Sequence, residues 1–435
     1  MSDRRSGRHV RALTALGVAA LLAPLAPVTA HAEEERIDLS SGDLIGLSGD
    51  GSALRVEESE AARGEGASLK RDGTDAPHGI AVFPGHPLDE ATDSLDVRLG
   101  TDGDLADLRT EARGVRADGM WTEWRTVPEG GGRVSLPRDV DEVQVRVEVE
   151  GTDSALTDLG VSPLPSTGSD GGSDGGEREE FDDPSGPDPF SARLFATRIG
   201  LEGETTANGH VIAADDHFAA LPSRRGLANR GGGEYTVRVC STGEFGPDAE
   251  GDTETHDPRC VYVPVWDVGP WNITDDHWNE DRESWEGLDR GRPQAQAAYT
   301  EGHNDGLDGF GRQVANPAGI DLADGAFHQG LQMPTNGWVE VDYLWTDDHA
   351  HRAEIITESN SEPVVVREGP GAEHDSVGLA APKAVVDVHC SVTGDDASGP
   401  HGTGDTWFRI GDGHYVPGAF ADGAGDAPEC PDERR

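Results

Sequence analysis

Apolar and polar residues alternate in short runs along most of the chain from about residue 37 onwards. The four valines of the segment 143–149 occupy every second position, which is typical of a half-buried β-strand. The segment 95–99 repeats this period of two. Short strands between Gly-rich turns, with few helical runs, predict a β-sandwich over residues 37–164.

Residues 165–190 break the pattern with a stretch rich in Gly, Ser, Asp and Glu. This stretch lacks the apolar residues needed to offset the entropy of ordering, so we expect a flexible acidic linker and a domain boundary. Beyond it, apolar runs such as 261–266 predict further strands in a second domain, residues 191–346, with one helix near 293–299.

The segment 362–430 consists of short predicted strands separated by Gly/Pro turns, a pattern that predicts a small β-barrel. The chain is therefore expected to be mainly β and multidomain. In the first domain, Trp121 and Trp124 have two open interpretations, strand packing or a flat platform for a sugar.

The first 32 residues have the order of a secretory signal peptide. Arg4 and Arg5 precede an apolar run over 12–25, and a small-residue site follows at Ala30-His31-Ala32. The run is too short and too interrupted by proline for a membrane span, and no other segment approaches one. We expect cleavage after Ala32 and a secreted, extracellular or cell-wall-associated protein.

The chain carries a formal net charge of −48 and has two lysines, Lys70 and Lys383. A surface of this charge repels nucleic acid and anionic lipid, so neither is an expected partner. It suits a protein that stays soluble at high salt, although a proteome rich in acidic residues would give the same composition.

Four cysteines in an exported chain predict disulfides, and four allow about three connectivities. Because the linker and domain pattern places two cysteines in each of two domains, we expect Cys240–Cys260 and Cys390–Cys430. No Cys-x-x-Cys spacing is present, so a metal site is the weaker interpretation of the cysteines. We expect no metal and no cofactor.

Two aspartates, Asp267 and Asp321, stand where an apolar run meets a turn or a helix start. A carboxylate there costs free energy unless it is hydrogen-bonded or does chemistry. Each is equally compatible with a turn or helix cap and with an active-site acid or base.

Three segments of the second domain occur in a characteristic order: the run from His217 to Leu221-Pro222, then 266–271 (Trp-Asp-Val-Gly-Pro-Trp), then 319–322 (Gly-Ile-Asp-Leu). The order resembles the double-psi β-barrel of RlpA-type lytic transglycosylases, expansins and endoglucanases. The resemblance implies a groove for a glycan, with Asp321 as the essential acid, Asp267 as its partner and His217 as an orienting group. Val268 stands where that family has an arginine.

Aromatic residues are the expected sugar contacts. Trp266, Trp271 and Trp278 cluster with Tyr262 in the second domain. Core packing is the alternative for Trp266, whereas Trp271 and Trp278 stand among polar residues and are expected to be exposed. The third domain is similar to bacterial SH3-like domains through its Val-Arg-x-Gly-Pro-Gly motif, residues 366–371. This similarity implies binding to cell-wall peptide or glycan through Trp407 and Tyr415, or else a structural barrel.

These expectations describe a secreted cell-envelope protein whose partner is cell-wall polysaccharide or peptidoglycan. As an enzyme it would cleave or remodel glycan strands, as a lytic transglycosylase or a glycoside hydrolase does. The alternative is a non-catalytic, expansin-like wall-binding protein. The first domain loosely resembles the sandwich that precedes the catalytic domain in secreted actinobacterial cell-wall amidases.

Overall fold

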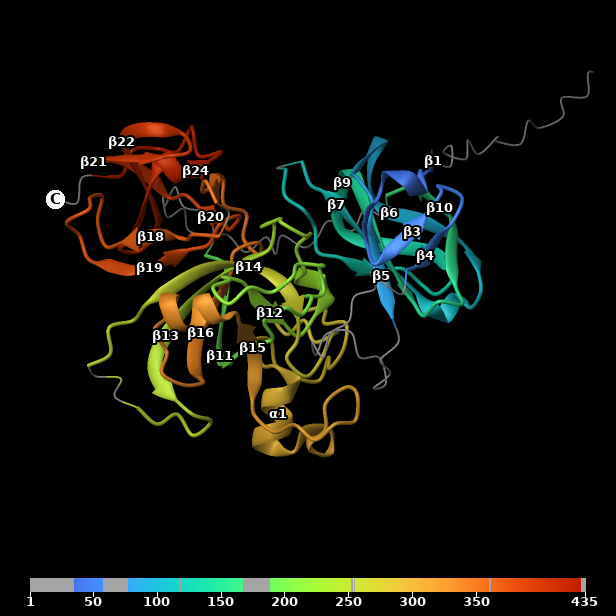
Figure 1. Cartoon of the computed structure of the whole chain (residues 1–435), viewed down its shortest axis with the longest axis horizontal. Helices are drawn as coiled ribbons and strands as arrows, with labels where there is room; N and C mark the ends of the chain where they lie inside the picture. Colours follow the sequence, from blue (N-terminus) through green and yellow to red (C-terminus); the bar gives the residue numbers. More distant parts are fainter. Residues whose placement is uncertain are drawn as a thin grey trace, which may run out of the picture. The chain divides into compact units, whose positions relative to one another are not determined.

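A computed structural model gives the structure of the chain, which it describes for residues 35–57, 77–117, 119–166, 188–251, 253, 255–359 and 361–431. The predicted signal peptide, 1–32, and the central part of the predicted linker, 167–187, lie outside the described residues. The fold is mainly β and multidomain, as the sequence predicts (Figure 1). In the described part of the chain, no helix has the length and apolar character to cross a membrane.

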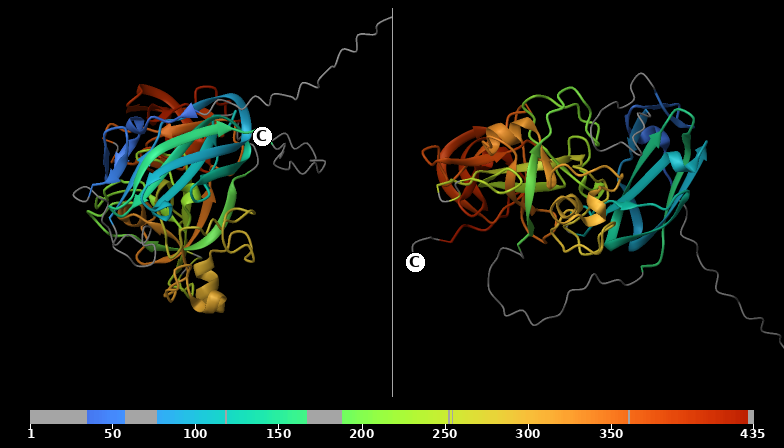
Figure 2. Two further views of the ribbon diagram at one scale, coloured as in Figure 1. Left: turned by 90° about the vertical axis from the view of Figure 1, so that its right-hand side faces the viewer. Right: turned by 90° about the horizontal axis from the view of Figure 1, so that it is seen from below.

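The first domain is a β-sandwich with ten strands. They are β1 (Glu35–Arg36), β2 (Asp43–Ile45), β3 (Leu47–Gly49), β4 (Leu54–Val56), β5 (His78–Val82), β6 (His86–Asp102), β7 (Leu108–Val115), β8 (Arg125–Thr126), β9 (Gly131–Glu150) and β10 (Ala155–Pro163). β9 pairs with β6 along its first part and with β5 and β7 along its second part, so one strand belongs to both layers. Figure 2 shows this domain, in blue to green, from two further sides.

The valines of β9 are buried in the sandwich core, as their spacing predicts. The prediction that this strand is half-buried is wrong, however, because its polar face is covered too. Gln144 and Arg146, which alternate with the valines, are 7% and 2% exposed. Arg146 donates to Glu111 at 2.8 Å, and Glu111 also accepts from Arg224 of the second domain at 3.2 Å. The polar face of β9 therefore forms a contact between domains.

The second domain is a closed six-stranded barrel. Its strands are β11 (Phe190–Arg198), β12 (Ala219–Leu221), β13 (Thr236–Phe245), β14 (Cys260–Val268), β15 (Ala318–Leu322) and β16 (Gly337–Tyr343). The order around the barrel is β12-β15-β11-β16-β13-β14, and the pairing of β14 with β12 closes it.

Two halves of the barrel repeat each other. The strands β11, β12 and β13 correspond to β14, β15 and β16, because exchanging the two sets leaves every pairing in place. Thus the parallel pair β11–β15 corresponds to the parallel pair β14–β12. The antiparallel pair β12–β15 corresponds to itself, so the approximate two-fold axis passes between these two strands. This is double-psi topology.

One α-helix, α1 (Gln294–Glu301), follows Pro293 as predicted and ends at Gly302, which has φ +71°. It lies against β15 in the barrel (Figure 1). Its buried alanines Ala295 and Ala298 pack with Val314, so the helix fastens the long segment between β14 and β15.

The C-terminal domain has β18 (Val364–Arg367), β19 (Ser376–Ala380), β21 (Cys390–Gly399), β22 (Gly402–Gly411) and β23 (His414–Pro417), with a separate sheet of β20 (Val385–Asp387), β17 (Arg352–Ile355) and β24 (Ala421–Asp422). β17 precedes the predicted start of this domain, residue 362. β19 pairs in parallel with β14, so a single sheet continues from the barrel into this domain. Gly378 permits this pairing, because a Cβ there would clash with the carbonyl oxygen of Cys260.

Both predicted disulfides are formed. Cys240–Cys260 joins the paired strands β13 and β14, and Cys390–Cys430 fastens the end of the described chain to the start of β21. The two bonds close loops with sequence separations of 20 and 40 residues. Such loops correspond to a stabilisation of about 3–4 kcal/mol each in the chain-entropy model.

Trp124 is a first-domain side chain in the core of the second domain. It is 1% exposed, packs within the barrel's hydrophobic cluster and donates its indole N–H to the carbonyl oxygen of Leu227 at 3.0 Å. Packing, rather than a sugar platform, is therefore the interpretation of Trp124 that the structure supports.

Replacing Trp124 with alanine is expected to destabilise the barrel together with the sandwich by about 3–5 kcal/mol, because a large cavity and an unpaired carbonyl remain. Denaturant unfolding of the full chain, followed by fluorescence and circular dichroism, measures this. Trp121, which is half-buried under the Arg113 guanidinium, is the matched control, and its alanine variant should lose less. Equal losses in the two variants would contradict this account.

Candidate functional site

The barrel places both predicted aspartates in one row across four neighbouring strands. Thr197 of β11 faces Asp321 of β15, Asp321 faces Ala220 of β12, and Ala220 faces Asp267 of β14. Residues that face each other in a sheet point to the same side, so the two carboxyl groups share one face. Two inter-strand spacings put their Cα atoms about 10 Å apart.

This row lies on the outer face of the barrel. The adjacent residues along the strands, Ala219, Leu322 and Val265, pack in the barrel core. The bulge at Trp266, which the pairing with β12 skips, turns Asp267 away from the face that Val265 occupies. Sequence alternation is therefore broken at the position where the strand carries its carboxylate.

Asp321 is half-buried and has an unusual protonation equilibrium. Burial raises the pKa of Asp321 to about 7, and the negative charge of Asp267 adds to this rise. A hydrogen bond from the Thr197 hydroxyl to Oδ1 of Asp321 acts in the opposite direction but is outweighed. Asp321 therefore titrates near neutral pH, where an ordinary exposed aspartate is fully ionised.

Asp267 is held more tightly, at 5% exposure. Its Oδ1 accepts backbone N–H groups from Ala207 and Val268, each at 2.9 Å. The Ala207 bond fixes the hairpin in which Thr205 faces Val211, and this hairpin covers the Asp267 end of the row. Asp267 thus holds the backbone of this hairpin in place and also puts a negative charge near Asp321.

His217 does not join the carboxylates. It is 5% exposed and lies beside Gly325, and burial lowers its pKa. Neither of its ring nitrogens is hydrogen-bonded to Asp267 or Asp321, so the expected bond that would orient one of these aspartates is not formed. The strand geometry explains this, because His217 lies three residues before Ala220, outside the row.

Most of the predicted sugar-contacting rings are buried, so this part of the prediction is wrong. Trp278 and Tyr262 are each 0% exposed. Trp278 donates its N–H to Glu123 of the first domain at 2.6 Å, and the Tyr262 hydroxyl lies against the C-terminal domain, 3.2 Å from the Ile410 carbonyl oxygen. These two rings bind neighbouring domains of the same chain instead of a ligand.

The aromatic pair of the C-terminal domain is also buried. Trp407 is 3% exposed and Tyr415 is 9% exposed, and Trp407 donates to the carbonyl oxygen of Asp395 at 2.9 Å. Because both rings are buried, they do not form the expected exposed aromatic surface.

Trp271 differs in keeping its ring half-buried. Its indole N–H donates to Asn316 at 3.1 Å, and the guanidinium of Arg312 lies 5.9 Å from the ring. Val268, at the position where the resembling family has arginine, is 1% exposed and packs with Ala207 and Leu227. No charged contact to a ligand comes from that position.

Thr197 is the residue of this site that sequence reasoning missed. It is separated from Asp321 by 124 positions and sits near the end of β11. No local signal distinguishes it. As for metals, the described residues contain no group of three or more His, Cys, Asp or Glu arranged to hold an ion.

Comparison with known proteins gives one match. Residues 190–342 match a family described as a domain of unknown function, DUF8814, and these residues span the six barrel strands almost to their end. No curated protein and no solved structure matches the chain.

The two neighbours of Asp321 should move its titration in opposite directions. NMR titration of isotopically labelled aspartate carboxyl carbons should give a midpoint for Asp321 at about pH 7. Thr197→Val removes the hydrogen bond that favours the charged form, so the midpoint should rise by about one pH unit. Asp267→Asn removes a like charge, so it should fall by a similar amount. An unchanged midpoint in both variants would contradict the proposed coupling.

Proposed function

We propose that the central barrel acts on glycan strands of the cell wall, with Asp321 as a general acid. The observation that carries this proposal is a half-buried carboxyl group on the outer face of the barrel whose pKa is raised by burial to about 7. Cleaving a glycosidic bond requires a proton on the leaving oxygen, and an acid that titrates near the working pH donates it most effectively. An ordinary surface aspartate would be fully ionised at that pH.

The environment of Asp267 favours a reaction with one acid rather than two. Inverting hydrolysis needs a second carboxylate about 6.5–9.5 Å away that activates a water molecule. Asp267 is nearly inaccessible, and one of its oxygens is occupied by two backbone N–H groups. In the one-acid route, Asp321 protonates the leaving oxygen, a hydroxyl of the same sugar attacks the anomeric carbon, and that hydroxyl's proton returns to Asp321. The products are a free hydroxyl end and an internal sugar anhydride.

The choice of peptidoglycan as the substrate rests on the resemblance to RlpA-type barrels and on the SH3-like motif of the third domain. A secreted location agrees with the two disulfides and with the signal pattern at the start of the sequence. A non-catalytic, expansin-like binding role is the second candidate. The absence of a charged side chain at Val268 and the burial of Trp278 favour it, because both remove expected contacts with a reacting sugar.

Digestion of purified sacculi separates the two candidates. Wild-type protein should release soluble fragments with internal anhydride ends, and Asp321→Asn should reduce the rate by about 100-fold or more. The rate should also fall as the pH rises above about 7, where Asp321 loses its proton.

Asp305→Asn, at an exposed carboxylate of the same domain, is the control and should retain full activity. Retention of the protein on sacculi without fragment release would support the binding role. Neither retention nor release would refute both candidates.

A further inference from the structure

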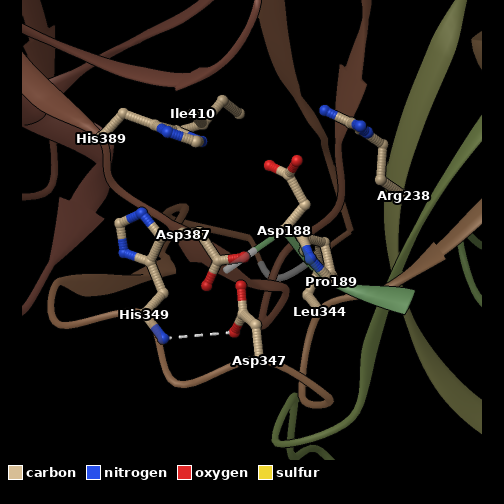
Figure 3. Close-up of a pocket in the computed structure, with 9 residues that line it drawn as sticks. All are labelled: Asp188, Pro189, Arg238, Leu344, Asp347, His349, Asp387, His389 and Ile410. Atoms are coloured by element: carbon tan, nitrogen blue, oxygen red, sulfur yellow. Dashed lines mark hydrogen bonds between the residues drawn. The ribbon is translucent and has the colours of Figure 1, made fainter. Parts of the chain in front are cut away.

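A small polar cavity lies where the barrel, the connector after it and the C-terminal domain meet (Figure 3). Its volume is about 50 Å³. Titratable or charged side chains from all three segments line it: Asp188, Arg238, Asp347, His349, Asp387 and His389. In Figure 3 the carboxyl groups of Asp347 and Asp387 lie side by side at its centre.

A single guanidinium group is hydrogen-bonded to both of these carboxyl groups. Arg352 donates through Nη2 to Asp347 and through Nε to Asp387, the latter at 2.7 Å. Asp347 and Asp387 are 3% and 4% exposed, so water does little to screen their charges. If both were ionised, two buried negative charges would face a single positive charge, so sharing one proton is the favourable state.

The other charged groups around the pair do not supply the missing positive charge. Arg238 of β13 is already paired with Asp342 at 2.6 Å, and Asp188, which also lines the cavity, adds a further negative charge. His349 and His389, whose ring centroids are 4.9 Å apart, face the cavity from the connector and from the C-terminal domain. Arg409 and Arg238 oppose protonation of His389.

The same connector also reaches the first domain. Asp348 forms ion pairs with Arg116 at 2.5 Å and with Arg138 at 3.2 Å. Arg352, besides its two carboxyl partners, donates to the Leu344 carbonyl oxygen at 2.9 Å. A change in the charge of the carboxyl pair would therefore affect the contacts of the connector with all three domains.

We propose that the Asp347–Arg352–Asp387 cluster is a proton-dependent latch, which holds β17 on the C-terminal sheet while the two carboxyl groups share a proton and loosens it when that proton is lost. β17 begins at Arg352, and its partner strand β20 ends at Asp387, which faces Arg352 across the pair. Repulsion at the cluster therefore acts on the first rung of this ladder. The latch is independent of any activity at Asp321.

The pH window follows from the opposing titrations. Burial raises the pKa of Asp387 to about 7, so its stabilisation is complete below the unfolded value of about 4 and is lost as the pH rises through about 7. Burial lowers the pKa of His389 to about 4, which makes stability increase with pH between about 4 and 6.5. His389 thus offsets Asp387 below pH 6.5, and the net loss from Asp387 falls between about pH 6.5 and 8.

Thermal unfolding of the full chain tests the latch. The melting temperature of the wild type should fall by about one degree between about pH 6.5 and 8, because Asp387 loses less than about 1 kcal/mol of its stabilisation over this interval. Asp387→Asn reproduces the protonated form, because its amide can still donate to Asp347 and accept from Arg352. Its melting temperature should stay level over this window and exceed that of the wild type at pH 8. Asp375→Asn, an exposed carboxylate of the same domain, should behave like the wild type.

A second measurement needs no variant. Amide hydrogen exchange, corrected for the intrinsic effect of pH, should show about two- to fourfold less protection in β17 at pH 8 than at pH 6.5. β10 of the first domain, which pairs with β1, β4 and β6 in a sheet separate from that of β17, should keep its protection. Unchanged protection in β17, or an equal fall of melting temperature in wild type and Asp387→Asn, would overturn the proposal.

Discussion

The fold depends on the burial of β14 along its whole length. A buried strand must pair its backbone groups on both edges, because an unpaired buried N–H or C=O costs free energy. β13 covers one edge of β14, whereas β19 and β12 divide the other edge between them. The pairing of the backbone N–H and C=O groups of β14 therefore closes the barrel, places Asp267 and attaches the C-terminal domain.

The first domain is built into the barrel in a comparable way. The segment between β12 and β13 donates or accepts hydrogen bonds through Arg224, Leu227 and Tyr235, and each partner lies in the sandwich. Because this segment directly follows the strand that carries Ala220, the sandwich supports the middle of the carboxyl row. The first domain is therefore more than an accessory module. Its buried charge pairs and its shared core with the barrel favour cooperative unfolding of the two domains.

Local patterns predicted what depends on local sequence. The period of two in β9, the helix after Pro293, the two disulfides and the mainly β class all follow from spacing and composition. Contacts between distant segments did not follow. Trp278 stands among polar residues and was expected to be exposed, yet a carboxylate 155 positions earlier accepts its N–H. The sequence does not indicate the role of Thr197 for the same reason, because Thr197 contacts Asp321 only when β11 lies beside β15.

The approximate two-fold axis of the barrel has a consequence for anything that lies across the row. Exchange of the halves would superpose Thr197 on Asp267 and Asp321 on Ala220, so the axis relates a carboxyl group to a methyl group. The backbone is nearly symmetric while its chemistry is not. A linear polymer whose two ends differ could therefore lie on this surface in two inequivalent orientations. The single carboxyl group of Asp321 distinguishes these orientations, although the two halves of the backbone are nearly alike.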